Sequence, residues 1–225
     1  MANSLTWLDL QGSLPLEHRS TCADEVLGLP KDDWFWVNFH GAYMCSIYNC
    51  REQEGWLGAR TFNPNLPKDS LLVRNIRDVL FPWMGGEGNV TIIRTEPGDT
   101  MREHIDSAAN EVGSTQYKFR WVLSGDTDSL YFIDEDYSHH YIGGSNIYVI
   151  NGAHPHGMAN RGEQTKLTLC VGSPWKANDV FLENIKDKPW HTLGMPGLIE
   201  EWTDPRIEQN KQNALGSTYL KQAPR

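Results

Sequence analysis

Hydrophobic residues recur with two different periods along the chain. In residues 68–81 they follow a helical spacing, which predicts one amphipathic helix, and Pro82 is expected to end it. Nearer the start, residues 15–27 predict a helix that stops at Gly28. The dense aromatic run at residues 34–39 predicts a strand. The first part of the chain is therefore expected to be helical and mixed.

Further along, the pattern changes to short apolar runs separated by turn sequences such as PGD, SGDTD and YIGGS. Strands at intervals of roughly 8–12 residues, with turn residues between them, are typical of an antiparallel sandwich or barrel. The expected order is helices first and sheet second. The predicted strands span residues 90–96, 116–123, 130–133, 140–142, 146–150 and 166–171.

Neither an internal repeat nor a linker divides the chain, and 225 residues are enough to bury one sizeable core. We therefore expect a single domain over residues 1–225. Its parts are a helical and mixed region of about residues 1–88, a β core of about residues 89–173, and an irregular segment of about residues 174–225. That last segment is expected to cover the sheet, with a lid or a dimer contact as the alternative.

Composition narrows the function classes. The net charge is −9, with 29 acidic against 20 basic side chains, so nucleic-acid binding is not expected. No apolar stretch approaches the length of a membrane span, and the first residues carry neither a secretory signal nor a transit peptide, so we expect a cytoplasmic protein. The four cysteines form no CxxC motif, which favours buried free thiols over disulfides or a zinc site.

Candidate chemistry begins with His104 and Asp106, because side chains two residues apart on an extended segment point to the same face. A second imidazole, from His154 or His156, follows the predicted strand 146–150. Two histidines and one carboxylate on one face of an ion form the facial triad of non-haem Fe(II) oxygenases, which leaves adjacent positions open for a chelating co-substrate and O₂. Zinc prefers a closed tetrahedron or a single open position.

Residues 151–169 resemble the end of the double-stranded β-helix core of Fe(II)/2-oxoglutarate oxygenases. The resemblance is closest to the aspartyl/asparaginyl β-hydroxylase-like group, which includes free-proline hydroxylases. That group shows a metal histidine, an A-N-R turn, and a basic residue ten positions beyond the histidine that pairs with the distal carboxylate of 2-oxoglutarate. Counting back ten positions from Lys166 gives His156, so the resemblance favours His156 over His154 as the second metal histidine.

The sequence EPGDTMREHID at residues 96–106 resembles the turn and first ligand strand of the same family, and YKFRWVL and LYFID resemble the strands that follow. The resemblance covers about residues 89–173. It implies a mainly β protein with flanking helices around a jelly-roll, cupin-like core. It also implies Fe(II) held by His104, Asp106 and His156, with 2-oxoglutarate as co-substrate.

Two positions depart from the family pattern. Lys166 stands where arginine is common, and the usual basic-x-His element reads Lys118-Phe119-Arg120. Lysine binds a carboxylate as a point charge and cannot form the bidentate fork of arginine. Because 2-oxoglutarate is a dianion, its distal carboxylate needs a buried cation. Lys166 is the first candidate for this anchor, with Arg120 and then Lys118 as alternatives.

The resemblance implies an enzyme that uses O₂ to hydroxylate an unactivated C–H bond of a small substrate, an amino acid either free or within a peptide. One alternative is a non-catalytic jelly-roll module that stacks some of its nine tryptophans and eight tyrosines on a carbohydrate. Another alternative is a cupin-like metalloenzyme that uses no oxo acid. The sequence leaves the substrate and the oligomeric state open.

Overall fold

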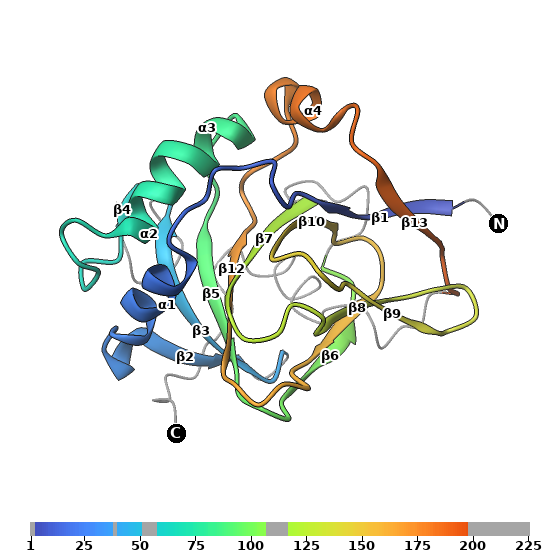
Figure 1. The fold of residues 1–225 in the computed structure, drawn as a ribbon, viewed down its shortest axis with the longest axis horizontal. Helices are drawn as coiled ribbons and strands as arrows, with labels where there is room; N and C mark the ends of the chain where they lie inside the picture. The colour runs from blue at the N-terminus through green and yellow to red at the C-terminus, as the bar shows by residue number, and fades with distance from the viewer. Residues whose placement is uncertain (1–2, 38–39, 51–57, 107–116, 198–225) are drawn as a thin grey trace, which may run out of the picture.

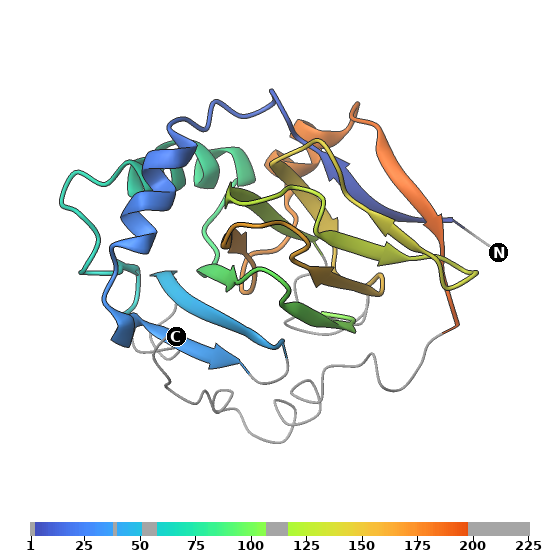
Figure 2. The same ribbon diagram turned by 60° about the horizontal axis from the view of Figure 1, so that its bottom comes forward.

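Two facing β-sheets, with helices against the outer side of the larger sheet, make up the fold (Figures 1 and 2). The computed structural model describes residues 3–37, 40–50, 58–106 and 117–197. The strands are β1 (Asn3–Asp9), β2 (Trp34–Val37), β3 (Ala42–Asn49), β4 (Thr61–Phe62), β5 (Val90–Thr95), β6 (Thr100–His104), β7 (Tyr117–Ser124), β8 (Leu130–Ile133), β9 (His139–Tyr141), β10 (Ile147–Asn151), β11 (His156–Ala159), β12 (Lys166–Val171) and β13 (Trp190–Gly194). The helices are α1 (Arg19–Leu27), the 3₁₀ turn η1 (Lys31–Asp33), α2 (Leu71–Arg74), the π-helical η2 (Asn75–Leu80), α3 (Phe81–Met84) and α4 (Asp179–Ile185).

The order of the strands defines the fold class. The larger sheet runs β13-β1-β10-β7-β12-β5-β3-β2, with β4 paired to β3, and the smaller sheet runs β6-β11-β8-β9. Strands β5 to β12 thus divide into two interleaved antiparallel groups, β5-β12-β7-β10 and β6-β11-β8-β9. This interleaving is the strand order of a double-stranded β-helix, or jelly roll. The predicted fold class, mainly β with flanking helices around such a core, is confirmed.

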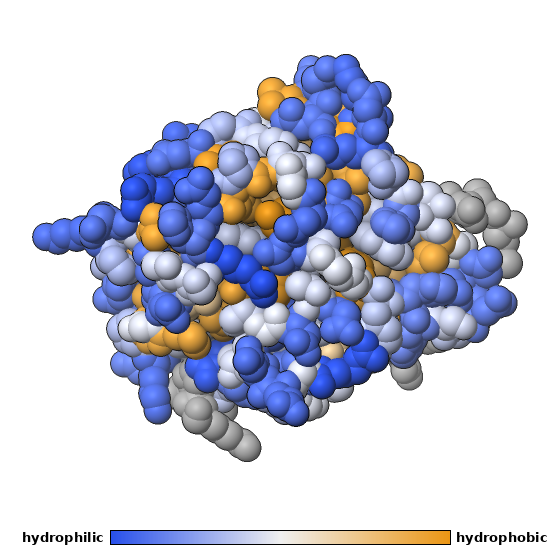
Figure 3. Space-filling view, in the orientation of Figure 1, coloured by the Kyte–Doolittle hydropathy of each residue, from blue (hydrophilic) through white to orange (hydrophobic). Residues whose placement is uncertain are grey.

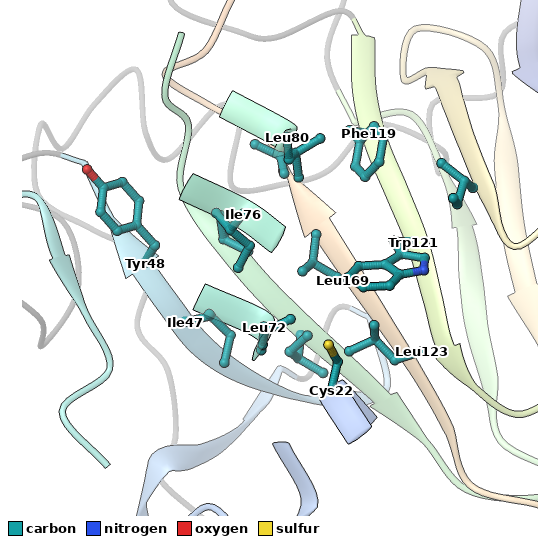
Figure 4. Packing of buried hydrophobic residues seen from close by; sticks show 14 of the residues in the cluster. Cys22, Ile47, Tyr48, Leu72, Ile76, Leu80, Phe119, Trp121, Leu123 and Leu169 are labelled. Atoms are coloured by element: carbon teal, nitrogen blue, oxygen red, sulfur yellow. The ribbon is translucent and has the colours of Figure 1, made fainter. Parts of the chain in front are cut away.

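Alternation along the central strands separates two cores. In β12, Leu167, Leu169 and Val171 belong to a core shared with the helices, whereas Cys170 belongs to a second core between the two sheets. Figure 4 shows residues of the helical layer facing Trp121 and Leu169 of the larger sheet. Because side chains alternate along a strand, the even-numbered positions of β12, including Lys166, face the smaller sheet.

On the face seen in Figure 3, hydrophilic residues cover most of the surface, with smaller hydrophobic areas between them. No helix in the described part of the chain is long and apolar enough to cross a membrane. The four cysteines are free, as expected, and Cys50 alone among them is half-buried rather than buried.

The helix predicted for residues 68–81 does not end at Pro82. Helical backbone runs from Leu71 to Met84 through α2, η2 and α3. Proline lacks the N–H that would continue an α-helix, but Pro82 stands in the first turn of α3, directly after the π-helical η2, where a missing N–H is tolerated. The other predicted helix begins later than expected, at Arg19.

Among the predicted strands, residues 130–133 and 166–171 are confirmed as β8 and β12, and the ends of the others shift by about one residue. Position 116 and positions 38–39 of the predictions lie outside the described residues. The expected order of helices before sheet is wrong, because β1, β2 and β3 join the larger sheet. Pairing with distant strands, of β1 with β10 and of β3 with β5, stabilises the two of these strands that the local pattern did not predict.

The segment after residue 174 was expected to cover the sheet, and the structure corrects this in part. Helix α4 packs Phe181 and Ile185 into the core beneath the helices. Strand β13, however, pairs with β1 and extends the larger sheet at its edge. A strand at a sheet edge is held largely by backbone hydrogen bonds to its neighbour. Such bonds do not depend on a hydrophobic pattern, so the sequence did not predict β13. Residues 198–225 lie outside the described part.

Leu169 tests the packing of helices on the larger sheet. Its side chain is fully buried, so Leu169→Ala should lower the free energy of unfolding by about 2–5 kcal/mol. The matched control Leu182→Ala removes the same atoms from a side chain that is 48% exposed, and should change stability by less than about 0.5 kcal/mol. Denaturant unfolding measures both; equal losses would contradict the packing described here.

Candidate metal centre

Three side chains meet where β6 and β11 pair in the smaller sheet. β6 ends at His104, Asp106 follows two residues later, and β11 begins at His156. His156 lies directly opposite His104 in the strand register. As a result, one ligand atom from each of His104, Asp106 and His156, here called the triad, lies within 4.8 Å of the others.

His156, rather than His154, belongs to this group. The histidine pair was expected to follow the strand 146–150 directly, but the chain crosses from β10 in the larger sheet to β11 in the smaller one. His154 lies in that crossover, where its Nε2 donates a hydrogen bond to the backbone oxygen of Ile133 at 2.7 Å. A carbonyl oxygen only accepts, so this nitrogen carries a proton and is engaged in holding the crossover to β8.

Hydrogen bonds orient both histidines of the triad. His104 Nδ1 lies 2.7 Å from the backbone oxygen of Arg102, and His156 Nδ1 lies 2.9 Å from that of His154. Because carbonyl oxygens accept, each Nδ1 carries the proton and each Nε2 keeps its lone pair. Outer contacts of this kind fix the tautomer and ring orientation of metal-binding histidines.

The triad has the spacing that a metal ion needs. His104 Nε2 lies 3.5 Å from Asp106 Oδ1, and His156 Nε2 lies 3.3 Å from Asp106 Oδ2. Ligands at right angles, with bonds of roughly 2.1 Å, are roughly 3 Å apart. Asp106 Oδ2 and His156 Nε2 are buried and have no hydrogen-bond partner within the described residues. The donor set and its unpartnered atoms therefore fit a divalent metal.

Two cations from β7 approach the carboxylate. Lys118 Nζ lies 2.7 Å from Asp106 Oδ1, and an Nη of Arg120 lies 3.9 Å from Oδ2. Burial alone would raise the pKa of Asp106, but the effects of its neighbours, led by the positive charge of Lys118, outweigh it, so the pKa lies well below its usual range. Asp106 is therefore an anion at neutral pH, as a metal ligand must be. For His156, burial is the largest effect and lowers the pKa.

Lys166 lies apart from the triad but in the same space between the sheets. Its side chain is fully buried, and Nζ donates to the backbone oxygen of Asp126 at 2.8 Å and to Ser129 Oγ. Ser129 immediately precedes β8, so the lysine reaches from the larger sheet to the smaller one. Burial lowers the pKa of Lys166 to about 8, although the carboxylates of Asp128 and Asp126 oppose the shift.

The register of β8 shows how far apart along this strand the contacts of Lys166 and of the triad lie. Phe132 pairs with His156, and Ser129, which contacts the lysine, lies three residues earlier in the chain. At about 3.3 Å per residue of extended strand, this separation is about 10 Å. The lysine and the triad are therefore two separate poles in the inter-sheet space, one cationic and one that fits a metal.

Two residues that contact Lys166 or His104 were not predicted from the sequence. Ser129 contacts Lys166, and His40, from the turn between β2 and β3, places its ring 4.9 Å from that of His104. Both positions follow from tertiary pairing. A serine in an SGDTDS turn and a histidine beside a glycine carry no local pattern that indicates such a site.

No protein-family model matches this chain, and no curated protein is significantly similar to it. Among solved structures, a prolyl-4-hydroxylase of Pseudomonas putida aligns over 75% of this chain and 92% of its own, with 14% identity and a TM-score of 0.47. A 2OG-Fe(II) oxygenase family oxidoreductase from Burkholderia pseudomallei aligns over 68% and 76%, with 15% identity and a TM-score of 0.41. The viral collagen prolyl hydroxylase of Paramecium Bursaria Chlorella virus-1 aligns over 74% and 93%, with 7% identity and a TM-score of 0.46.

These similarities are low in identity and in TM-score, and they carry no information about the activity of this chain. The chain itself carries an HxD…H pattern formed by His104, Asp106 and His156. The pairing of β6 with β11 in the double-stranded β-helix brings these three side chains together.

The environment of Lys166 can be measured directly. Its ammonium should titrate near pH 8, against an ordinary value of 10.5, because burial disfavours the charged form. Unfolding then takes up a proton between these pH values, so the contribution of this group to the free energy of unfolding rises with pH there. NMR of the lysine ¹³Cε resonances, assigned with Lys166→Met, gives the midpoint. A midpoint near 10.5 would show that the lysine is hydrated.

Proposed function

We propose that this chain is an Fe(II)- and 2-oxoglutarate-dependent oxygenase that hydroxylates an unactivated C–H bond of a small substrate. The observation that supports this most is the pair of buried ligand atoms, Asp106 Oδ2 and His156 Nε2, 3.3 Å apart and without hydrogen-bond partners in the described part of the chain. Buried polar atoms without partners cost free energy. One metal ion bound by the triad would satisfy both.

The choice of Fe(II) rests on the donor set. Two imidazoles and one carboxylate on adjacent strands occupy one face of an ion, and leave its other face for a chelating co-substrate and O₂. A structural zinc site would need a fourth protein ligand. Among the described residues, only the triad groups three or more histidine, cysteine or acidic side chains closely enough to hold a metal.

The second pole supports 2-oxoglutarate as the co-substrate. Its oxo acid end would chelate the metal, and its distal carboxylate would bind Lys166, with the Ser129 hydroxyl beside it as a further donor. An extended five-carbon dicarboxylate, with a metal at one end and a lysine at the other, would suit a strand separation of about 10 Å. Lys118 contacts Asp106 instead, and Arg120 lies 3.9 Å from the same carboxylate, so both are weaker candidates for this anchor.

Bound Fe(II) would supply activation of O₂, coupled to oxidative decarboxylation of 2-oxoglutarate to succinate and CO₂ and to hydroxylation of the substrate. The chain's own residues bind, orient and exclude water. His104 and His156 keep their Nε2 lone pairs aimed inward through their Nδ1 hydrogen bonds. The triad side chains are at most 7% exposed, which keeps the reacting groups away from bulk water.

The proposed substrate is an amino acid, either free or as a residue of a peptide. Support for this class comes from the resemblance of residues 89–173 to amino acid and peptide hydroxylases. A substrate enclosed between the two sheets of the double-stranded β-helix would have to be small.

The alternative of a carbohydrate-binding module has less support. Stacking on a sugar needs exposed rings, and two aromatic residues of the β core, Trp121 and Tyr148, are each only 1% exposed. Such a module also has no need for a buried lysine between its sheets. A cupin-like metalloenzyme without an oxo acid shares the metal site, so binding of 2-oxoglutarate is the measurement that separates it from the proposed function.

Metal binding tests the triad. The protein should bind one Fe(II) under anaerobic conditions, and 2-oxoglutarate should then give the weak visible charge-transfer band of a chelated iron. Asp106→Ala, which removes the only anionic ligand, should weaken both, as should His104→Ala and His156→Ala.

His154→Ala is the matched control, because it removes a buried imidazole that stands two residues before His156 and is not part of the triad. It should lower stability and leave the Fe(II) stoichiometry unchanged. Loss of Fe(II) with His154→Ala but not with His156→Ala would contradict the assignment.

Lys166→Met tests the anchor. The change keeps the apolar stem and removes the charge, so the apparent affinity for 2-oxoglutarate should fall roughly 100-fold or more, since an unpaired buried charge costs about 3–5 kcal/mol. Fe(II) binding should be nearly unchanged, and Lys166→Arg should retain part of the affinity. Succinate release as a function of 2-oxoglutarate concentration measures the effect. Unchanged affinity in the Met variant would move the anchor to Arg120 or Lys118.

A further inference from the structure

The two carboxylate oxygens of Asp106 have different surroundings, because Lys118 contacts only one of them. Its ammonium lies 2.7 Å from Oδ1, whereas Oδ2 lies 3.3 Å from His156 Nε2 and has no hydrogen-bond partner within the described residues. Arg120 lies 3.9 Å from Oδ2, beyond hydrogen-bond distance. One oxygen of the carboxylate is therefore held by a lysine, and the other is left for a metal.

We propose that Lys118 is a positioning residue that keeps Asp106 a one-oxygen ligand. This inference rests on the proposed function. Carboxylates bind metals through either one or both oxygens. With two imidazoles and one oxygen, a six-coordinate ion keeps three open positions, enough for a two-point chelator and O₂. A second oxygen from Asp106 would leave two positions, and the chelator and O₂ could not bind together.

The fold holds Lys118 in place for this role. It lies on β7, in the middle of the larger sheet, between the buried β10 and β12. Its neighbour Phe119 is buried on the opposite face, in the core beneath the helices. The Lys118 side chain is 22% exposed, so part of it stays in contact with water, which reduces the desolvation cost of the pair.

The charge of Lys118 has a second effect, with the opposite sign. A cation in contact with the metal's only anionic ligand repels the metal. It also lowers the attraction between that ligand and the metal. Replacing Lys118 by a neutral residue should strengthen metal binding and free Oδ1 to coordinate. The same change should weaken binding of a two-point chelator, because an open position is lost. A lysine that only supported the fold would lower both affinities when replaced.

The experiment uses Co(II), which is stable in air, as the metal probe and 2-oxoglutarate as the chelator. Calorimetry gives the affinity of the whole protein for Co(II), and the visible Co(II) spectrum reports 2-oxoglutarate binding to the loaded protein. Lys118→Met should bind Co(II) about tenfold more tightly and 2-oxoglutarate about tenfold more weakly. Lys118→Arg should restore both values towards those of the unmodified protein.

Two controls separate this effect from general changes. Lys186→Met removes an exposed lysine paired with Glu183 and should move neither affinity. If Lys118→Met does not fold, judged by circular dichroism of the metal-free protein, Lys118→Gln gives the same comparison because it also lacks the ammonium.

The possible results distinguish the positioning role of Lys118 from the proposed function itself. Tighter Co(II) with weaker 2-oxoglutarate binding supports the positioning role. If both affinities fall, or neither moves, the role of Lys118 is overturned while the metal site stands. If the unmodified protein binds no Co(II), the proposed function is overturned and the inference with it.

Discussion

The pairing of β6 with β11 is the contact on which the candidate site depends. It sets His156 opposite His104, and Asp106 follows His104 just beyond the end of β6. Residues about fifty positions apart in the sequence therefore bring their ligand atoms within 4.8 Å of one another. This pairing exists only because the double-stranded β-helix sends alternate strands to opposite sheets. A register shift of one residue would turn His156 to the outer face of the smaller sheet and dismantle the site.

Charge compensation explains how the ionised side chains between the sheets are arranged. A buried carboxylate at Asp106 needs cations, and Lys118 and Arg120 supply them from β7. A buried lysine needs acceptors, and Lys166 finds them in the loop before β8. The larger sheet thus provides the cations and the smaller sheet the histidines. A chelating dianion suits both ends of this arrangement, which links the fold to the proposed chemistry.

Sequence reasoning found the parts whose information is local. The fold class, β8, β12 and the His104-x-Asp106 spacing follow from alternation and from a motif on one strand. Strands β1, β3, β11 and β13 were missed because they are held by partners distant in the chain. The roles of Lys118 and Ser129 also depend on which strands become neighbours, which no local pattern encodes. The choice of His156 over His154 came from a family spacing, and the crossover between sheets supplies its physical reason.

A crystal structure of the protein grown without O₂, with Mn(II) in place of Fe(II) and with 2-oxoglutarate, tests the central claim most directly. Anomalous scattering locates the manganese independently of any assumption about its ligands. The account predicts one ion bonded to His104 Nε2, Asp106 Oδ2 and His156 Nε2, and the distal carboxylate of 2-oxoglutarate against Lys166. An ion bound by other residues, or no ion between the two strands, would contradict it.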